Sequence, residues 1–396
     1  MRRQRYRDYL AGLGYRTRLL AALSLGWAGL QAGRFLLPPL LPRIQADLGL
    51  SAATAGGILT AFGLVYAVAQ YPAGVASDRL SRATLLLPGL VVLVSSVALL
   101  SLSVTAWLFL VAVAVFGVGK GLFSSPSRAL LGDLYATNRG RALGIYSAGT
   151  DVGGLAAAGL AVVVLATPGW REAFVPVAVA LSLVTVLFLG WNREPYSLER
   201  VPLKPGATAG RVLASRVQRE RIAAYSLFYF AVGGLTNFYP TLLVTARGFD
   251  EGLAGASFAL VFVVGLVVKP GAGVVSDRFP RLLVSVAGLL LAAAGLALVL
   301  LGPGLSGVAA GTVLVSAGYK TQFPIADAAV LEAAPDGDLG GDLGAARGAF
   351  LTAAALGPGV VGVVAERTGF EVAFWLLAAA FLAAAAVLGR QYASGP

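Results

Sequence analysis

The sequence of 396 residues contains no cysteine and no histidine. The chain therefore cannot form disulfides, use a thiolate nucleophile or build the usual zinc sites. A histidine proton relay is excluded for the same reason, so any proton carrier must be a carboxylate. The sequence also lacks a glycine-rich phosphate-binding loop, and nothing in it indicates ATP as the energy source. We expect no metal and no cofactor.

Charge is scarce as well. Charged residues make up 12% of the chain against 58% hydrophobic residues, and the mean hydropathy is +0.81. A soluble domain normally carries about twice that share of charge. Apolar stretches long enough to cross a bilayer recur along the chain. The sequence therefore predicts an all-α membrane protein with twelve transmembrane helices, near 19–41, 51–76, 83–103, 106–131, 140–166, 170–191, 222–245, 253–276, 282–301, 305–331, 345–366 and 370–390.

The basic residues are distributed unevenly between the two sides of these helices. Basic residues within two positions of a predicted helix end are counted with the adjoining connection. Of the 30 Lys and Arg, 21 then fall in the termini and in the connections on the same side as Met1. Four fall on the opposite side, and five lie within helices. The positive-inside rule then predicts a multi-pass protein of the cell (plasma) membrane with both termini cytoplasmic. We interpret the arginine-rich start of the chain, "MRRQRYRDYLAGLGYRTR", as a cytoplasmic tail rather than a signal peptide. This distribution accounts for the net charge of +11 without a nucleic-acid partner.

The longest polar segment divides the chain almost in half. We predict an N-terminal six-helix bundle with its tail over residues 1–192, a basic linker over 193–221 and a C-terminal six-helix bundle over 222–396. The linker holds seven basic residues and three prolines. Such a segment is attracted to the anionic lipid of the inner membrane surface.

One short polar phrase occurs twice, as "YPAGVASDRLSR" and as "VKPGAGVVSDRFPR". Further segments match in the same order: "GKGLFSSP" falls opposite "YKTQFP", which pairs Lys120 with Lys320, and "GWREAF" answers "GFEVAF". These matches indicate two pseudo-symmetric six-helix bundles that arose by duplication. The repeated phrase aligns Gly74 with Gly273, and its two copies comprise Gly74, Asp78, Arg79, Arg82, Gly273, Asp277, Arg278 and Arg281.

The pattern G-x-x-x-D-R-x-x-R after the second helix of each half resembles the signature loop of the major facilitator superfamily. The resemblance covers almost the whole chain and implies the MFS fold of a secondary transporter. It also implies that the two loops gate the protein by latching the bundles together on the cytoplasmic side, with Asp133, Arg139 and Arg141 as network partners. The alternative is a pair of basic loops that only obey the positive-inside rule.

A second motif, "GTDVGG" at 149–154, resembles the fifth-helix signature G-P-x-x-G-G of the family's drug antiporters. Thr150 stands where that signature has proline, which argues against drug antiport. Glycines at these spacings suit plain helix packing equally well.

Several charged or polar residues fall at membrane depth, where each is costly unless it faces a cavity or a partner. In the family fold, the first, fourth, seventh and tenth helices line a central cavity. The predicted substrate-binding residues lie on these helices: Gln31, Arg34, Lys120, Asn237, Tyr239, Lys320 and Gln322. Three cations in such a cavity would attract an organic anion. Alternatively, the lysines snorkel to an interface or pair with carboxylates. Lys269 and Arg128 lie nearer the cytoplasmic ends, and for them we favour this alternative, snorkelling or structural pairing with a carboxylate.

Asp151 and Asp327 are the main carboxylates at membrane depth. Either could carry a coupling proton, and either could be a permanent counter-ion to one of the cations. The sequence does not choose between these roles.

We therefore predict a monomeric secondary transporter that moves a small organic solute, an organic anion in the favoured interpretation, by rocker-switch alternating access. Cotransport of a proton would make it a symporter. An efflux pump for hydrophobic drug-like compounds is the first alternative, and a transporter-like membrane sensor without flux is the second. We do not expect an enzyme, because the sequence offers no dense group of catalytic residues.

Overall fold

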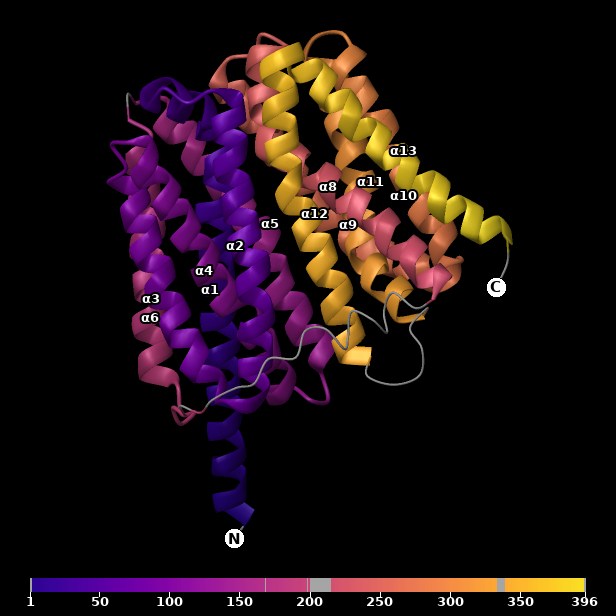
Figure 1. Cartoon of the computed structure of the whole chain (residues 1–396). Helices are drawn as coiled ribbons and strands as arrows, with labels where there is room; N and C mark the ends of the chain where they lie inside the picture. The colour runs from indigo at the N-terminus through magenta and orange to yellow at the C-terminus, as the bar shows by residue number, and fades with distance from the viewer. Residues whose placement is uncertain (1, 168, 198, 200–214, 333–338, 395–396) are drawn as a thin grey trace. The chain divides into compact units, whose positions relative to one another are not determined.

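The structure is a computed structural model that describes residues 2–167, 169–197, 199, 215–332 and 339–394. Twelve long α-helices run through these residues (Figure 1), and a single 3-10 turn at Arg171–Ala173 precedes α6. The helices are α1 (Arg2–Leu48), α2 (Ala52–Arg79), α3 (Arg82–Ser101), α4 (Ala106–Leu134), α5 (Arg139–Leu165), α6 (Phe174–Trp191), α8 (Arg216–Thr245), α9 (Glu251–Arg278), α10 (Arg281–Leu301), α11 (Gly304–Glu332), α12 (Leu339–Thr368) and α13 (Phe370–Ser394).

All twelve predicted helices are present. Among the described residues, eleven helices are long and apolar enough to cross a membrane, and α11 is the remaining long helix. Three helices start six or more residues earlier than the hydropathy predicts, and one of them is α12, which begins at Leu339 rather than near 345. Helix α1 begins at Arg2, so the predicted tail continues the first helix. Helix α8 begins at Arg216, where the Ser215 side chain accepts a hydrogen bond from the Gln218 backbone N–H and caps the helix.

The chain forms two compact units. The first comprises residues 1–36, 68–160 and 171–203, and the second comprises residues 37–67, 161–170 and 204–396. The second unit thus contains the C-terminal end of α1, most of α2 and the turn after α5, together with α8 to α13. The predicted division at 192 and 222 stays a prediction, and residues 200–214 of the predicted linker lie outside the described part of the chain.

The repeated phrase occupies the same helix boundaries in both halves. Helices α2 and α9 end at Arg79 and Arg278, and helices α3 and α10 begin at Arg82 and Arg281. The equivalent helix boundaries are 199 residues apart, and the same offset relates the turns that follow α1 and α8. There Gly49 and Gly248 adopt φ values of 62° and 68°, a left-handed conformation that glycine reaches without steric cost.

Glycines also allow α3 to cross α4 and α10 to cross α11 at short range. A Cβ added at Gly119 would lie 3.0 Å from the Leu93 backbone nitrogen, and one at Gly318 would lie 2.4 Å from that of Ala292. Gly119 and Gly318 are 199 residues apart, and so are Leu93 and Ala292. The two copies of the repeated phrase are separated by the same number of residues. Close backbone approach of this kind is the usual way in which helices pack in lipid.

This equivalence corrects the pairing of the two lysines. Because Gly119 corresponds to Gly318, Lys120 corresponds to Tyr319, and Lys320 corresponds to Gly121. Matching the lysines directly shifts the helices by one residue, which is about 100° of rotation around an α-helix. The two lysines therefore do not occupy equivalent faces of α4 and α11.

Two of the four basic residues on the predicted outer side cap the C-termini of equivalent helices. Arg171 donates from Nε to the Ser103 carbonyl oxygen at 2.8 Å, after the end of α3. Arg247 donates to the carbonyl oxygens of Leu300, at 2.7 Å, and Gly302, at the end of α10. Ser103 and Gly302 are equivalent positions under the same offset, so the same carbonyl receives an arginine in each half. A cation at a helix C-terminus satisfies free carbonyls and complements the helix dipole.

Candidate functional site

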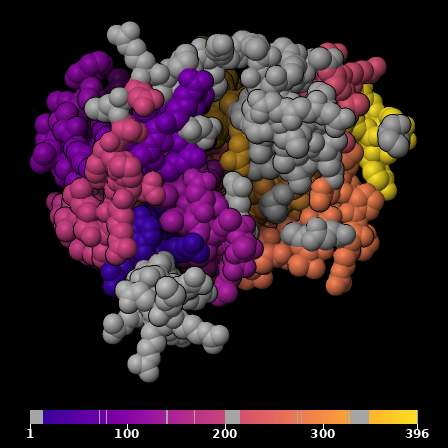
Figure 2. Space-filling view, turned by 90° about the horizontal axis from the view of Figure 1, so that it is seen from below, coloured from indigo at the N-terminus to yellow at the C-terminus, as the bar shows by residue number. Residues whose placement is uncertain are grey.

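In the first unit, three helices contribute polar or aromatic side chains to one region. Helix α1 lies between α5 and α6, as Figure 2 shows for the indigo, magenta and pink parts of the chain. The approach to α5 is close, because a Cβ added at Gly153 would lie 2.3 Å from the Ala28 carbonyl oxygen. Trp27, Gln31 and Arg34 are four and three residues apart, so they follow one face of α1.

The inner part of this region is an aromatic stack. The rings of Trp27 and Tyr146 lie 5.2 Å apart with an interplanar angle of 25°. Hydrogen bonds hold both rings: Trp27 Nε1 donates to Thr150 Oγ1 at 2.9 Å, and the Tyr146 hydroxyl is 2.7 Å from Ser127 Oγ. The stack therefore fixes α5 to both α1 and α4.

A guanidinium group lies against this stack. Arg128 Cζ is 5.3 Å from the centroid of the Trp27 ring and 5.9 Å from that of Tyr146, and the residue is half-buried. Both distances are within the range of cation–π attraction. The sequence favoured snorkelling or carboxylate pairing for Arg128, and the structure adds a contact of its charge with the rings of α1 and α5.

Lys120 and Arg34 form the other part of the site. Lys120 is 5% exposed, and both Arg34 and Arg128 lie within electrostatic reach of it. Arg34 is half-buried. Asp151 on α5 is 1% exposed in the same unit. The first unit thus brings together three cations, two of which were predicted as substrate ligands.

Five buried side-chain oxygen atoms of this unit have no hydrogen-bond partner among the described residues. Two of them lie within one turn of a cation of the site: Oε1 of Gln31, which is 3% exposed, and Oγ of Ser124, which is fully buried. The other three belong to Tyr15, Ser24 and Gln70. Ser124 lies one turn after Lys120 on α4. A buried polar atom without a partner costs free energy, so these atoms are positioned to take a ligand or a water.

The predicted residues of the second unit lie in denser surroundings. Lys320 is 3% exposed, and its Nζ is 5.0 Å from the Phe262 ring centroid and 5.4 Å from that of Tyr319. The Tyr239 hydroxyl bonds to Thr312 and faces a cavity of about 10 Å³, which is room for about one water. This cavity is too small for an organic ligand.

Gln322 and Asn237 are engaged in helix contacts. Gln322 is fully buried, and its Nε2 donates to the Ser285 carbonyl oxygen on α10 at 3.1 Å. Asn237 donates to the Gly233 carbonyl oxygen of its own helix at 2.7 Å. The side chain of Asp327 lies outside the described part of the structure.

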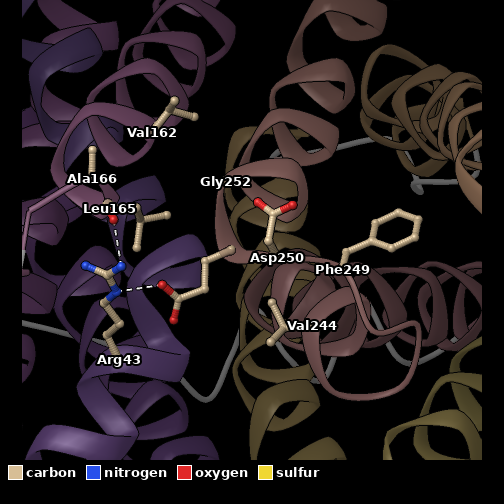
Figure 3. A pocket seen from close by; sticks show the side chains of 9 residues that line it. Arg43, Val162, Leu165, Ala166, Val244, Phe249, Asp250 and Gly252 are labelled. Atoms are coloured by element: carbon tan, nitrogen blue, oxygen red, sulfur yellow. Dashed lines mark hydrogen bonds and ion pairs between the residues drawn. The ribbon is translucent and has the colours of Figure 1, made fainter.

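A pocket of about 520 Å³ opens in the second unit between the end of α5 and the start of α9 (Figure 3). Arg43 bridges it: Nε is 2.5 Å from Glu251 Oε2, and the other two nitrogens donate to the carbonyl oxygens of Leu165 and Thr167 at 2.6 Å. Apolar residues of α5 and the carboxylate of Asp250 complete the lining.

The contact between α2 and α12 corresponds to the α5–α9 contact, because α2 is equivalent to α9 and α5 to α12. It is built in a different way. A Cβ added at Gly56 would lie 2.4 Å from the Pro358 carbonyl oxygen, and the Gly359 backbone N–H donates to Thr60 Oγ1 at 2.9 Å. Glu366 accepts a hydrogen bond from the Ala53 backbone N–H at 2.8 Å. Close backbone packing thus fills the α2–α12 contact, whereas the Arg43–Glu251 ion pair spans a pocket at the α5–α9 contact.

The predicted gating loop makes contacts in the first unit. Arg82 Nε lies 3.3 Å from Asp133 Oδ2, and its Nη1 donates to Ser77 Oγ at 2.7 Å. Ser197 joins the same loop, because its hydroxyl accepts from the Ser81 backbone N–H at 2.9 Å. The surroundings of Gly273 and the side chains of Asp78, Asp277 and Arg139 lie outside the described part of the structure.

A family model described as Major Facilitator Superfamily matches residues 23–302 and 221–392. The chain belongs to the Major Facilitator Superfamily. This membership, with the twelve helices, confirms the predicted fold and the resemblance of the repeated loop. The proteins of this family are multi-pass membrane transporters, and eleven of the described helices of this chain are long and apolar enough to cross a membrane.

Three curated relatives show the range of solutes in this neighbourhood. The chain is 25% identical over 60% of its length to a hexuronate transporter of Bacillus subtilis, and 26% identical over 60% to a probable sulfoacetate transporter of Cupriavidus necator. The matched regions span 58% and 59% of those two proteins. The chain is also 26% identical over 72% to the multidrug resistance protein MdtL of Escherichia coli O157:H7, covering 73% of it.

Solved structures support the same fold. A D-xylose-proton symporter superposes with a TM-score of 0.76 at 17% identity, with 94% of this chain and 97% of that chain covered. At this identity the likeness shows the fold alone.

Arg128, Trp27 and Tyr146 were not predicted as site residues from the sequence. One signal was present in the sequence: Arg128 follows Lys120 by eight residues, which places both on one face of α4. No sequence pattern links Trp27 to Tyr146, which are brought together only by the packing of α1 against α5.

Proposed function

We propose that this transporter is a secondary carrier for a small organic anion, which binds first at Arg34 and Lys120. The observation that carries the proposal is the grouping of three cations in the first unit, in which Asp151 is the single buried carboxylate among the residues described. The unpartnered oxygens of Gln31 and Ser124 lie within one turn of Arg34 and Lys120. Charges at membrane depth that face a protein interior often mark substrate pathways. An arriving carboxylate or sulfonate would compensate the excess positive charge.

The curated relatives support the same substrate class. Hexuronate and sulfoacetate are both organic anions, and both names belong to relatives that match this chain over 60% of its length. Transport would proceed by rocker-switch alternating access, with the repeated loops acting as the cytoplasmic latch. Asp151, which is 1% exposed, is the candidate carrier of a coupling proton, and Asp327 remains the second candidate from the sequence.

The protein would act as a monomer in the plasma membrane with both termini in the cytoplasm. The support for this orientation is the concentration of basic residues on one side of the predicted helices. Reporter fusions at residues 1 and 396 that are active only outside the cell would contradict it.

Efflux of hydrophobic drug-like compounds is the second candidate function. The match to MdtL favours it. It would not need the cations at membrane depth, so the two functions differ in their dependence on Lys120.

Uptake into proteoliposomes tests the proposal, with monocarboxylates, sugar acids and sulfonates as solutes and an imposed proton gradient. We expect Lys120→Ala to lower uptake of the accepted anion at least about tenfold, because a charge-assisted contact is worth about 1.5–3 kcal/mol. Lys320→Ala should lower it less, since Lys320 lies against Phe262 and Tyr319. Normal anion uptake by both variants would refute the anion site, and uptake of hydrophobic cations alone would favour efflux. Ligand binding without any flux would indicate a sensor.

A further inference from the structure

Arg128 is the charged group of the first unit whose surroundings the proposed function leaves unexplained. Its guanidinium lies over the Trp27 and Tyr146 rings, and within the described residues no hydrogen bond or ion pair reaches it. A guanidinium offers five N–H donors in one plane. Ring faces attract the charge but accept none of these hydrogen bonds in the way that a carboxylate does.

The aromatic stack holds this arginine in a defined place. Trp27 and Tyr146 are each fixed by a hydrogen bond to a neighbouring side chain, at 2.9 Å to Thr150 and 2.7 Å to Ser127. An arginine that stacks on fixed rings loses little further entropy when an anion binds at the edge of its guanidinium plane. The arrangement therefore resembles a preorganised anion receptor more closely than a freely snorkelling side chain.

The position of Arg128 relative to the first two cations follows from helix geometry. Arg34 lies seven residues beyond Trp27 on α1, which corresponds to about 10 Å of axial rise. Lys120 lies eight residues before Arg128 on α4, about 12 Å along that helix. Arg34 and Lys120 thus form one cationic level, and Arg128 forms a second level nearer the end where α4 terminates. Between them lie the unpartnered oxygens of Gln31 and Ser124.

We propose that Arg128 forms a second anion subsite, which binds the second anionic group of an organic dianion whose first group is held at Arg34 and Lys120. The substrate class is then a dicarboxylate or a carboxylate that carries a sulfonate. The polar middle of such a molecule would lie beside Gln31 Oε1, which can accept a hydrogen bond from it, and Ser124 Oγ, which can donate or accept one. This inference rests on the proposed function and adds the charge and length of the substrate to it.

Binding and uptake by the purified full-length chain test the subsite. The probes are a series of linear dicarboxylates of increasing length and the monocarboxylates of matching length. The variants are Arg128→Gln, Arg128→Lys and Trp27→Leu, with Arg18→Gln as a control that removes an exposed positive charge from α1. Affinity is measured by competition against the accepted anion and by thermal shift.

We expect Arg128→Gln to weaken binding of the best dicarboxylate about tenfold to a hundredfold, since one charge-assisted contact is lost. The affinity for the matching monocarboxylate should change less than about threefold. Arg128→Lys should give an intermediate loss, because an ammonium keeps the charge but not the planar pair of donors. Trp27→Leu should weaken dicarboxylates in the same direction, and Arg18→Gln should change neither class.

Two results would overturn the subsite. Equal losses for mono- and dicarboxylates would mean that Arg128 contributes only a long-range field. Unchanged affinities would mean that Arg128 snorkels to water at the inner interface. In both cases Lys120→Ala would still lower anion uptake, so the proposed function would stand. If the wild-type protein takes up no organic anion at all, the proposed function itself fails.

Discussion

The two halves of the chain agree at turns and helix crossings and differ in the side chains of their fourth helices. Gly49 and Gly248 end equivalent helices, and Gly119 and Gly318 sit at equivalent crossings, each pair separated by the offset of the repeated phrase. At the next position the halves diverge, because Lys120 in the first half corresponds to Tyr319 in the second.

This difference separates two kinds of constraint. Glycine is favoured at a left-handed turn and where a neighbouring backbone leaves no room for a Cβ atom, so both halves keep glycine at these positions. A residue that faces a polar interior is constrained by what binds there. The first half groups Arg34, Lys120 and Arg128, whereas the second half holds Lys320 and Lys269 against aromatic rings of Phe262, Tyr319 and Phe323. We therefore expect the charged side of any substrate site to belong to the first half.

The glycine crossings give the largest expected effect. Gly318→Ala places a Cβ 2.4 Å from the Ala292 nitrogen and the Gly288 oxygen, whereas Gly119→Ala places one 3.0 Å from the Leu93 nitrogen. Overpacking against backbone costs about 1–3 kcal/mol, and we expect Gly318→Ala at the upper end and Gly119→Ala at the lower end. Thermal unfolding of the purified protein, followed by tryptophan fluorescence, measures both.

The matched control for these variants is Gly271→Ala on α9, where nothing lies within 4 Å of an added Cβ. Alanine is the better helix former, so this variant should be neutral or more stable by up to about 1 kcal/mol. A destabilising Gly271→Ala, or a silent Gly318→Ala, would remove the packing explanation for the shared glycines.

The arginine caps on α3 and α10 give an intermediate effect in both halves. Arg171→Gln and Arg247→Gln each remove a charged donor from carbonyls at a helix end, and each should cost about 1–3 kcal/mol of unfolding free energy. Arg367 is exposed and caps no helix among the described contacts, so Arg367→Gln should stay within about 0.5 kcal/mol. Equal losses of unfolding free energy for all three substitutions would show that the loss depends on net charge and not on capping.

The smallest effect on stability is expected at the pocket of Figure 3. Glu251→Gln removes the ion pair with Arg43 but leaves the bonds of Arg43 to the carbonyls at and after the end of α5. A partly exposed pair contributes about 1 kcal/mol or less. If this pair helps to hold the α5–α9 contact closed, its loss should speed labelling of Leu165→Cys, which is 9% exposed in this structure.

The absence of native cysteines makes this labelling experiment clean, because a single introduced thiol is the only reactive one. Glu366→Gln is the matched control, since it alters the α2–α12 contact, where glycine packing persists. Faster labelling of Leu165→Cys in both variants, or in neither, would show that the ion pair is not specific to the α5–α9 contact.

Much of the fold could be predicted because its causes are local. Runs of apolar residues long enough to span lipid predict the twelve helices, and the repeated Asp–Arg phrase predicts the shared boundaries at Arg79 and Arg278. Arg34, Lys120 and Lys320 could be singled out because a charge inside such a run is costly wherever the helix packs.

The register between the halves could not be predicted in the same way. Lys120 and Lys320 look equivalent in the sequence, but a shift of one residue turns a side chain by about 100°. Only the contacts of Gly119 with Leu93 and of Gly318 with Ala292 fix which residues correspond.

The sequence by itself determined a twelve-helix membrane protein built from two related halves, because hydropathy and internal repetition can both be read from the order of the residues. The tertiary structure decided which charges share one site. Arg128 meets Trp27 and Tyr146 only after α1, α4 and α5 pack together. Such contacts join residues that are far apart in the chain, and their formation depends on the rotation of each helix about its axis, which the order of residues does not specify.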